Sequence, residues 1–194
     1  MARFFTAHRG WYAAAALVLF GLDQWTKALV VRGIPYRHSV PVLPDLFHLT
    51  HTRNLGGAFG LFQDLADSWR GLIFSVVPLV VLGFLAVYAY RTPVGHTGLQ
   101  SGLALIMGGA LGNICDRLRL GYVVDFLDFH WRDWHWPAFN LADSSIFLGV
   151  VLILLLELPG RQPPAAEEPP APQAPGPETE ARREVLGWSE KTRR

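Results

Sequence analysis

The chain has 194 residues, of which 51% are hydrophobic and 17% charged, and its formal net charge is +1. Soluble domains carry roughly 25% charged residues, so this is not the composition of an ordinary soluble domain. Because the net charge is small and no basic block stands outside the extreme C-terminal tail, we expect no nucleic-acid partner. The single cysteine, Cys115, excludes an internal disulfide and a cysteine-rich zinc site, and its simplest interpretation is a small apolar side chain in a helix.

The first predicted element is an uncleaved transmembrane helix over residues 11–31. Arg3 and Arg9 precede an almost wholly apolar run, as they would in a signal peptide. No small-residue cleavage site follows, however, because Asp-Gln-Trp-Thr-Lys occupies positions 23–27 and the apolar run then continues. At about 1.5 Å per residue such a run just spans a hydrocarbon core of about 30 Å.

The segment from residue 33 to residue 70 is mixed and interrupted by prolines. Residues 40–52 alternate loosely between apolar and polar side chains, which predicts short strands. A glycine-rich turn is expected at residues 53–60. We expect residues 61–69 to form a short amphipathic helix on the membrane interface.

Three further runs with little or no charge predict three more spans. They cover about residues 72–90, 97–115 and 138–156. Pro78 is tolerated inside the second span because neighbouring helices can satisfy the freed carbonyl. Residues 160–194 are rich in Pro, Ala and Glu and are expected to form a disordered tail. The sequence therefore predicts an all-α membrane protein with four transmembrane helices over residues 1–159.

Four spans would place both termini on one side of the membrane. Arginines and lysines gather on that side, near the N-terminus, at Arg91 and in the C-terminal tail, so the positive-inside rule makes it cytoplasmic. Several arginines fall on the opposite side as well, and the bias is therefore moderate. The 34–70 segment and the 118–137 loop would then face the external or periplasmic side.

Two aspartates at the same predicted membrane face are the candidate catalytic residues. Asp125 is expected just after the third span and Asp143 in the first turn of the fourth. A carboxylate is costly at membrane depth, and two in a poorly hydrated site cannot both ionise easily, so they would share a proton. The charged one would then take a proton from water as general base while the neutral one polarised a scissile carbonyl, as in an aspartic protease.

Each aspartate also has a simpler interpretation. Asp143 could only cap its helix, where unpaired amides and the dipole would stabilise it. Asp125 could be a solvated loop residue, although its setting, Val123-Val124-Asp125-Phe126, is too apolar for a solvated loop tip.

Polar residues on the helices could support this pair. Asp23 and Lys27 are four apart with the acid first, the favourable order for an ion pair, which could also simply neutralise the helix in lipid. Asn113 and Arg117 are also four apart, with Asp116 rotated away from their face, and Arg117 could merely snorkel to the interface.

Two further predictions concern the fourth helix and the glycines of the third. Asn140 and Asp143 are three apart and are expected to share a helix face. Gly108, Gly109 and Gly112 form a small-residue face, which predicts close helix packing. No metal site is predicted, because the histidines lack ligand spacing and no H-E-x-x-H motif or Ser/His/Asp order is present.

Five short blocks make the chain resemble the lipoprotein signal peptidases (signal peptidase II) of bacterial inner membranes. They appear in the family's order, and together they cover most of residues 11–157. The blocks are residues 23–27, 54–60, 108–117, 123–126 and 139–143. Five motifs in order on a four-span topology are a far more specific signal than any one of them.

The resemblance implies an aspartic endopeptidase that removes the signal peptide from a prolipoprotein, cutting just before a diacylglyceryl-modified cysteine. It places the catalytic dyad on Asp125 and Asp143 and requires no cofactor. It also implies residues that support the dyad or bind the substrate. These are Asp23, Lys27, Asn54, Gly56, Asn113, Arg117 and Asn140.

The resemblance further implies a small β-cradle and a short periplasmic helix after the first span. Gly57 stands where the family often has alanine, a change expected only to loosen that loop. Lipidated prolipoproteins and membrane lipid are the expected partners of a monomer in the inner membrane, with the active site near the periplasmic face. We assign the tail no catalytic role.

Two other classes of protein remain as alternatives. A small transporter or proton relay would spread charged residues across membrane depth, whereas residues 72–90 and 97–115 contain no Asp, Glu, Lys, Arg or His. A purely structural helical bundle would leave the one-sided clustering of Asn, Asp and Arg unexplained.

Overall fold

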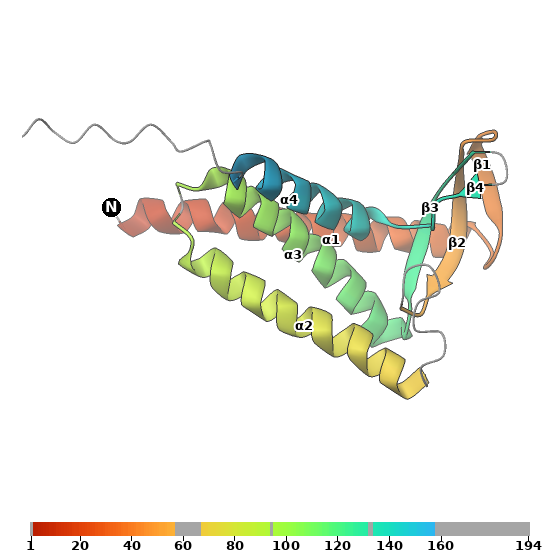
Figure 1. Cartoon of the computed structure of the whole chain (residues 1–194), viewed down its shortest axis with the longest axis horizontal. Coiled ribbons are helices and arrows are strands. Elements are labelled where there is room, and N and C mark those ends of the chain that lie inside the picture. The colour runs from red at the N-terminus through yellow and green to blue at the C-terminus, as the bar shows by residue number, and fades with distance from the viewer. Residues whose placement is uncertain (1, 57–66, 94, 132–133, 158–194) are drawn as a thin grey trace, which may run out of the picture. The chain divides into compact units, whose positions relative to one another are not determined.

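The computed structural model describes residues 2–56, 67–93, 95–131 and 134–157. Within these ranges it contains a bundle of helices with a small antiparallel sheet at one end (Figure 1). The helices are α1 (Ala2–Gly33), α2 (Asp67–Arg91), α3 (Thr97–Leu120) and α4 (Leu141–Glu157). The strands are β1 (Ser39–Leu43), β2 (Phe47–Asn54), β3 (Val123–Trp131) and β4 (Trp134–His135). The predicted tail and most of the predicted interfacial helix at 61–69 lie outside the described residues.

The central helix is α3, which packs against α1, α2 and α4 (Figure 1). Its adjacent glycines face different neighbours. A Cβ atom on Gly108 would lie 2.8 Å from the carbonyl oxygen of Ala16 on α1, and one on Gly109 would collide with the carbonyl of Ala142 on α4. The predicted small-residue face therefore does bring helix backbones close together.

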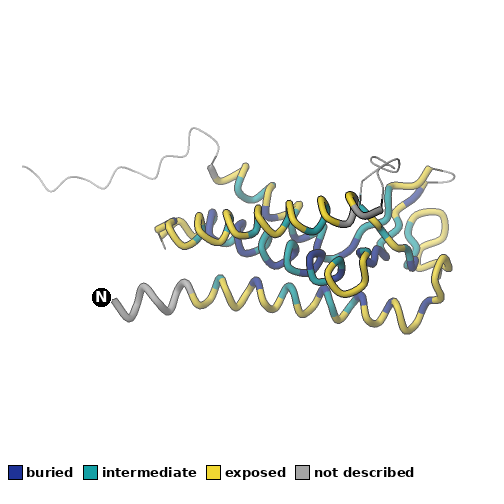
Figure 2. The backbone as a smooth tube through the Cα atoms, turned by 90° about the horizontal axis from the view of Figure 1, so that it is seen from below, coloured by how far each residue is buried: buried dark blue, intermediate teal, exposed yellow. Residues whose placement is uncertain are grey.

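Among the described residues, three helices are long and apolar enough to cross a membrane. Their candidate spans are Gly10–Gly33, Leu72–Arg91 and Thr97–Leu120. The apolar part of α4, Leu141–Leu156, is shorter, so a fourth crossing stays a prediction. Much of the bundle surface is apolar: α1, which begins at the N-terminus marked in Figure 2, carries exposed residues along most of its length, with buried ones at intervals.

Two helices have ends that differ by a few residues from those of the predicted spans. The third helix does not stop near residue 115 but continues to Leu120, where Gly121 ends it with a left-handed φ of 79° and an N–H donated to the Arg117 carbonyl. The fourth helix begins at Leu141 and not at residue 138. Phe139 cannot be helical because its backbone forms a bridge with Leu127 of β3.

The sheet has the strand order β1-β2-β3-β4, and every neighbouring pair is antiparallel. The strands predicted within residues 40–52 are confirmed, but the predicted loop at 118–137 contains β3. The first four residues of β3, Val123 to Phe126, are all buried. A strand covered on both faces lacks the polar–apolar alternation that reveals strands in a sequence.

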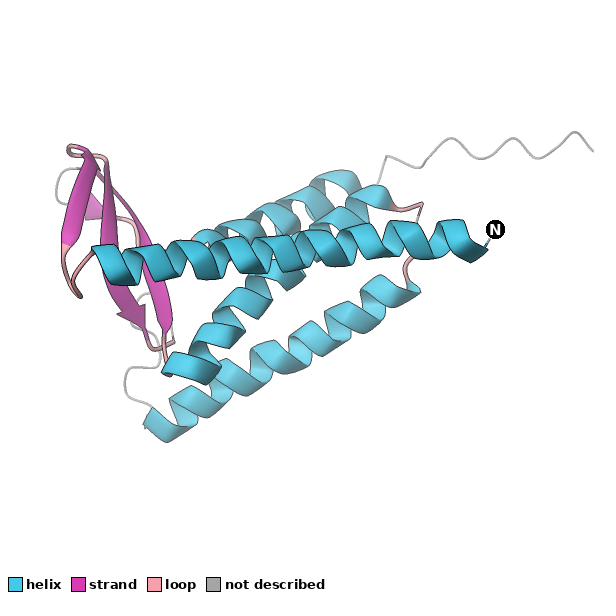
Figure 3. Cartoon of the chain, turned by 180° about the vertical axis from the view of Figure 1, so that it is seen from behind, coloured by secondary structure: helices cyan, strands magenta, loops and turns pink. Residues whose placement is uncertain are grey.

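The sheet is attached to the bundle through the C-terminal end of α1 (Figure 3). There Val30 and Ile34 of α1 pack against Val124 and Phe126 of β3 in one buried apolar cluster. This packing fixes the start of β3 beside the helices, and Asp125 lies between its two apolar anchors.

Candidate active site

Asp125 lies on β3 and is only 3% exposed. Its Oδ1 accepts a hydrogen bond of 2.7 Å from the side-chain amide of Asn140, and its Oδ2 accepts one of 3.0 Å from the amide of Asn54. Asn54 ends β2, and Asn140 directly precedes α4. Three segments that are distant in the sequence therefore meet at one carboxylate.

Asp143 and Asn140 form a capping box at the start of α4. The backbone N–H of Asp143 donates to Asn140 Oδ1 at 2.9 Å, and the backbone N–H of Asn140 donates to Asp143 Oδ2 at 3.2 Å. The two residues therefore lie together at the start of α4, as their spacing predicts, although Asn140 is the N-cap and precedes the first helical residue. The other oxygen of Asp143, Oδ1, accepts a hydrogen bond of 2.7 Å from Asn113 on α3.

Asn140 connects the two aspartates. It is 0% exposed, and its amide nitrogen donates to Asp125 while its amide oxygen accepts from the backbone of Asp143. The same nitrogen also lies 3.2 Å from Asn113 Oδ1. A side chain with this many partners has one orientation, so it holds the two carboxylate-bearing segments in a fixed relation.

Lys27 is the centre of a buried charge cluster behind the aspartates and is 3% exposed. Its ammonium has three donors and meets three acceptors. They are Asp23 Oδ2 at 2.8 Å, Asp116 Oδ2 at 3.0 Å and Asn113 Oδ1 at 2.9 Å. The predicted Asp23–Lys27 pair is confirmed, and Asn113 links it to Asp143.

Asp23 on α1 also reaches the first turn of α4. Its Oδ1 accepts a hydrogen bond of 3.0 Å from the backbone N–H of Ala142, one of the donors that a helix start leaves unpaired. Space for this carboxylate depends on Gly112, because a Cβ atom there would collide with it. Residues of α1, α3 and α4 therefore fit around one carboxylate.

Two residues of the cluster were not among the predicted site residues. Asp116 is buried and bonds to Lys27 and to the backbone N–H of Val124, at 3.0 and 3.1 Å. Gln24 donates to Asp116 Oδ1 at 2.9 Å. The prediction that Asp116 is rotated away from the face of Asn113 is wrong, because both side chains bond to the ammonium of Lys27. Their spacing of three residues could have indicated this shared face, and Gln24 stands inside the first family block.

Gly56 and Arg117 lie at the edge of the site. Gly56 has a φ of 111°, and its N–H donates to Asn54 Oδ1 at 2.9 Å, which turns the amide nitrogen of Asn54 toward Asp125. The guanidinium of Arg117 lies 5.9 Å from the ring centroid of Phe74 and interacts electrostatically with both aspartates. Its buried Nε has no hydrogen-bond partner among the described residues.

The electrostatics of the site favour the protonated form of the Asp125 carboxyl. Burial, and next the negative charge of Asp143, raise the pKa of the Asp125 carboxyl from 3.8 to about 7. The hydrogen bonds from Asn54 and Asn140 act in the opposite direction on the same pKa. Two neighbouring carboxyl groups that hold one proton near neutral pH can serve as an acid and a base in the same reaction.

The sheet also carries a second group of polar side chains, away from the helix interior. His48, Asp128 and His130 have potential ligand atoms that all lie within 4.8 Å of one another. The sequence prediction of no metal site rested on spacing along the chain, which does not reveal residues that pair across strands.

Comparison with known proteins gives consistent matches. The model of the family described as signal peptidase (SPase) II matches residues 15–158. The chain is 48% identical over 138 residues to the lipoprotein signal peptidase of Desulforapulum autotrophicum, covering 71% of this chain and 85% of the relative. It is 42% identical over 140 residues to that of Pseudomonas aeruginosa, covering 72% and 82%.

One solved structure of similar fold is a bacterial membrane enzyme determined by the in meso method at 2.3 Å resolution. It matches with a TM-score of 0.70 and 29% sequence identity, over 82% of this chain and 94% of that one. A second bacterial membrane enzyme, determined at 1.9 Å, matches with a TM-score of 0.67 and 32% identity over 78% and 94%.

Proposed function

The chain belongs to the signal peptidase II family, whose members cleave signal peptides from prolipoproteins, and from this we propose that it is an aspartic endopeptidase. Asp125 and Asp143 form the catalytic dyad. The cleaved bond is the one just before a diacylglyceryl-modified cysteine. The observation that carries the proposal is the buried Asn140 side chain, which bonds to Asp125 and to the backbone of Asp143.

The chemistry follows from one proton shared by the pair. The ionised carboxylate takes a proton from water, whose oxygen attacks the carbonyl carbon of the scissile peptide. The protonated carboxyl gives its proton to the carbonyl oxygen, which yields a neutral tetrahedral diol. When the C–N bond breaks, the carboxyl that was just protonated gives its proton to the leaving nitrogen, and the proton of a diol hydroxyl returns to the other carboxylate.

The surrounding residues have positioning roles in this proposal. Asn54, Asn113 and Asn140 orient the carboxylates through the hydrogen bonds described above. Lys27, Asp23 and Asp116 hold α1 and α3 around the start of α4. Gly56 is assigned to the peptide backbone of the substrate, and so is Arg117, whose Nε has no hydrogen-bond partner in the described part of the chain.

The proposed location is the inner membrane, with the dyad near its periplasmic face and both termini in the cytoplasm. The sheet and the start of α4, which carry Asp125 and Asp143, lie at one end of the helices, whereas the chain begins at the other end (Figure 1). A diacylglyceryl group keeps its acyl chains in the bilayer, so the adjacent peptide bond must be cut near the membrane surface. Hydrolysis at this depth requires that water reach the dyad from the membrane surface.

The decisive experiment compares two substrates and four proteins in lipid. Wild type is incubated with a diacylglyceryl-modified prolipoprotein and with the same polypeptide lacking the lipid, and the mass shift is followed. We expect cleavage of the lipidated form alone. Asp125→Asn and Asp143→Asn are each expected to lower the cleavage rate by about 10²- to 10⁴-fold, which is the usual contribution of general acid–base catalysis.

Asp45→Asn is the matched control. Asp45 is exposed, lies in the β1–β2 turn and has a positive φ of 59°, a conformation that asparagine also tolerates. This variant should cleave like the wild type. Activity within about tenfold of wild type in either dyad variant would contradict the assigned dyad, given the contribution expected of such groups.

A further inference from the structure

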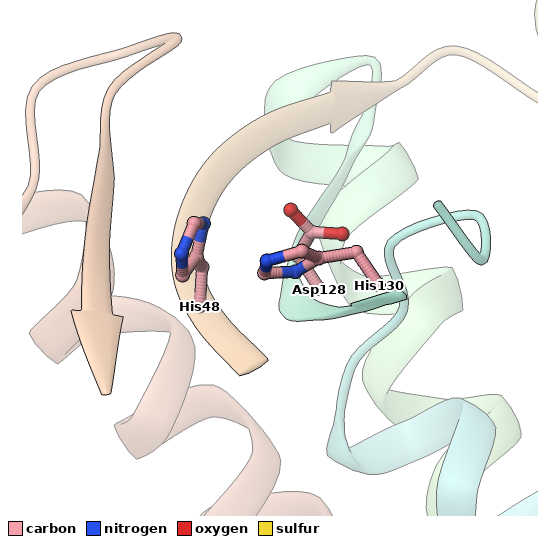
Figure 4. A group of neighbouring side chains, drawn as sticks. All are labelled: His48, Asp128 and His130. Atoms are coloured by element: carbon pink, nitrogen blue, oxygen red, sulfur yellow. The ribbon is translucent and has the colours of Figure 1, made fainter. Parts of the chain in front are cut away.

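We propose that the sheet binds one divalent transition-metal ion, of which Zn²⁺ is the best match, through His48, Asp128 and His130. Figure 4 shows the His48 ring on β2 facing the His130 ring, with the Asp128 carboxylate beside them. The site is distinct from the dyad and is not needed for the proposed hydrolysis.

Strand pairing accounts for the meeting of these side chains. His48 stands opposite Asp128 in the antiparallel β2–β3 ladder, so both point to the same face of the sheet. His130 follows Asp128 by two residues and therefore shares that face. Asp125 is three residues before Asp128, and the same alternation directs it to the other face.

The donor set suits zinc. Two imidazole nitrogens and one carboxylate oxygen are a common set of three protein ligands for Zn²⁺, which leaves a fourth position for water. Tetrahedral coordination with bonds of about 2.0–2.2 Å puts ligand atoms about 3.3 Å apart. The three potential ligand atoms here already lie within 4.8 Å of one another, so modest side-chain rotations bring them to that spacing.

A second observation points to a missing partner in this cluster. His130 is buried, and its Nδ1 has no hydrogen-bond partner among the described residues. Buried polar atoms are nearly always paired, because water no longer solvates them. The two imidazole rings also lie close together, with centroids 4.2 Å apart and an interplanar angle of 56°.

His135 contacts Asp128, the proposed carboxylate ligand, without being a proposed ligand itself. Its Nδ1 lies 3.0 Å from Asp128 Oδ1, and its ring stacks on His130 with centroids 4.8 Å apart. Asp128 is only 13% exposed, whereas His135 is 52% exposed. This contact orients the carboxylate in the way that outer partners orient metal ligands.

The test is a Zn²⁺ titration of the full-length, tag-free protein in detergent, after treatment with a chelator, followed by isothermal calorimetry. We expect saturable binding of one ion per chain in the wild type. His48→Gln and His130→Gln should lose this binding at concentrations that saturate the wild type. His96→Gln is the control, because His96 is exposed and precedes α3 outside the cluster, and it should bind like the wild type.

Thermal unfolding in the presence of Zn²⁺ gives a second readout that does not require a mutation in the core. The ion should raise the Tm of the wild type and of His96→Gln, because it binds the folded state, and should leave the Tm of Asp128→Asn unchanged. Asp128→Asn keeps the size of the side chain and remains informative if a histidine variant fails to fold. No saturable binding by the wild type, or equal binding by the wild type and these variants, would overturn the site and leave a hydrogen-bonded histidine cluster.

Discussion

At the scale of single residues, the site depends on asparagine amides more than on ion pairs. Asn54 and Asn140 each donate to one oxygen of Asp125, and Asn113 joins Asp143 to Lys27. An amide offers a donor and an acceptor on one rigid group, so it can fix a carboxylate without supplying a counter-charge. The pKa of Asp125 therefore stays raised. A lysine in place of either asparagine would lower this pKa through its positive charge.

The pH dependence of cleavage is the prediction at this scale. The pKa of Asp125 is raised to about 7, so the proton of the pair is lost as the pH rises through that value, and kcat/KM should fall on the alkaline side. The hydrogen bond from Asn54 lowers this pKa, and Asn54→Ala should therefore move the alkaline limb to higher pH. The rates are measured with the lipidated substrate across the pH range.

The same shift affects stability with a defined sign. Between about pH 4 and pH 7 the folded state binds the Asp125 proton more tightly than the unfolded state does, so this group's contribution to stability falls as the pH rises and is lost above about 7.

The control for the pH dependence of cleavage is again Asp45→Asn, which should leave the alkaline limb of the kcat/KM profile unchanged. An alkaline limb that Asn54→Ala leaves in place, or moves to lower pH, would contradict the assignment of the limb to Asp125.

At the scale of elements, the helices were easier to predict than the strands that complete the site. Long uncharged runs predicted α2 and most of α3. The uncharged run that predicts the third span ends at Cys115, whereas helix α3 continues to Leu120, and Asp116 finds a buried partner in Lys27. Asp125 was expected in a loop because β3 is buried on both faces at its start, which removes the alternating pattern.

The fit of α3 against α1 gives the prediction at this scale. In Gly112→Ala the new methyl group would collide with the Asp23 carboxylate and lie 3.3 Å from Ala142 Cβ. We expect a loss of about 1–3 kcal/mol of stability, as is usual for overpacking, together with lower activity because Asp23 is displaced from Lys27. Thermal unfolding in detergent and the cleavage assay measure the two effects.

Gly21→Ala is the matched control, because it makes the same change in helix α1 where nothing lies within 4 Å of the new atom. Alanine is favoured over glycine inside a helix by about 0.5–1 kcal/mol, so this variant should be as stable as the wild type or more so. If both glycine variants unfolded at the same temperature, the close packing at Gly112 would not matter to stability.

At the scale of the whole molecule, the motifs identified the site residues, but the contacts among them needed the fold. The sequence order of the five blocks was sufficient to suggest the family, and the family match to residues 15–158 confirms it. The role of Asn140 at the start of α4 could not be predicted, since helix boundaries are uncertain from a sequence by a few residues. The meeting of His48 with His130 depends on the pairing of β2 with β3, which the spacing of these residues along the chain does not reveal.

Removal of residues 160–194 is the prediction at this scale. Every residue assigned to the dyad and its support lies between Asp23 and Asp143, and the family match ends at residue 158. The truncated protein should therefore cleave the lipidated substrate at the wild-type rate. The assay compares both proteins in the same lipid, after their insertion and Tm have been shown to agree. A large loss of activity in a normally folded truncation would give the tail a role.

The shared use of the start of α4 has a consequence for newly made copies of the enzyme. Asp23 of α1 and Asn140 bond to the first turn of α4, and Asn140 also bonds to Asp125 on β3. A chain whose last helix has not yet docked cannot bring the two carboxylates together. With the proposed dyad on Asp125 and Asp143, such an immature copy would be unable to cleave its neighbours in the bilayer, and completion of folding would itself activate the protein.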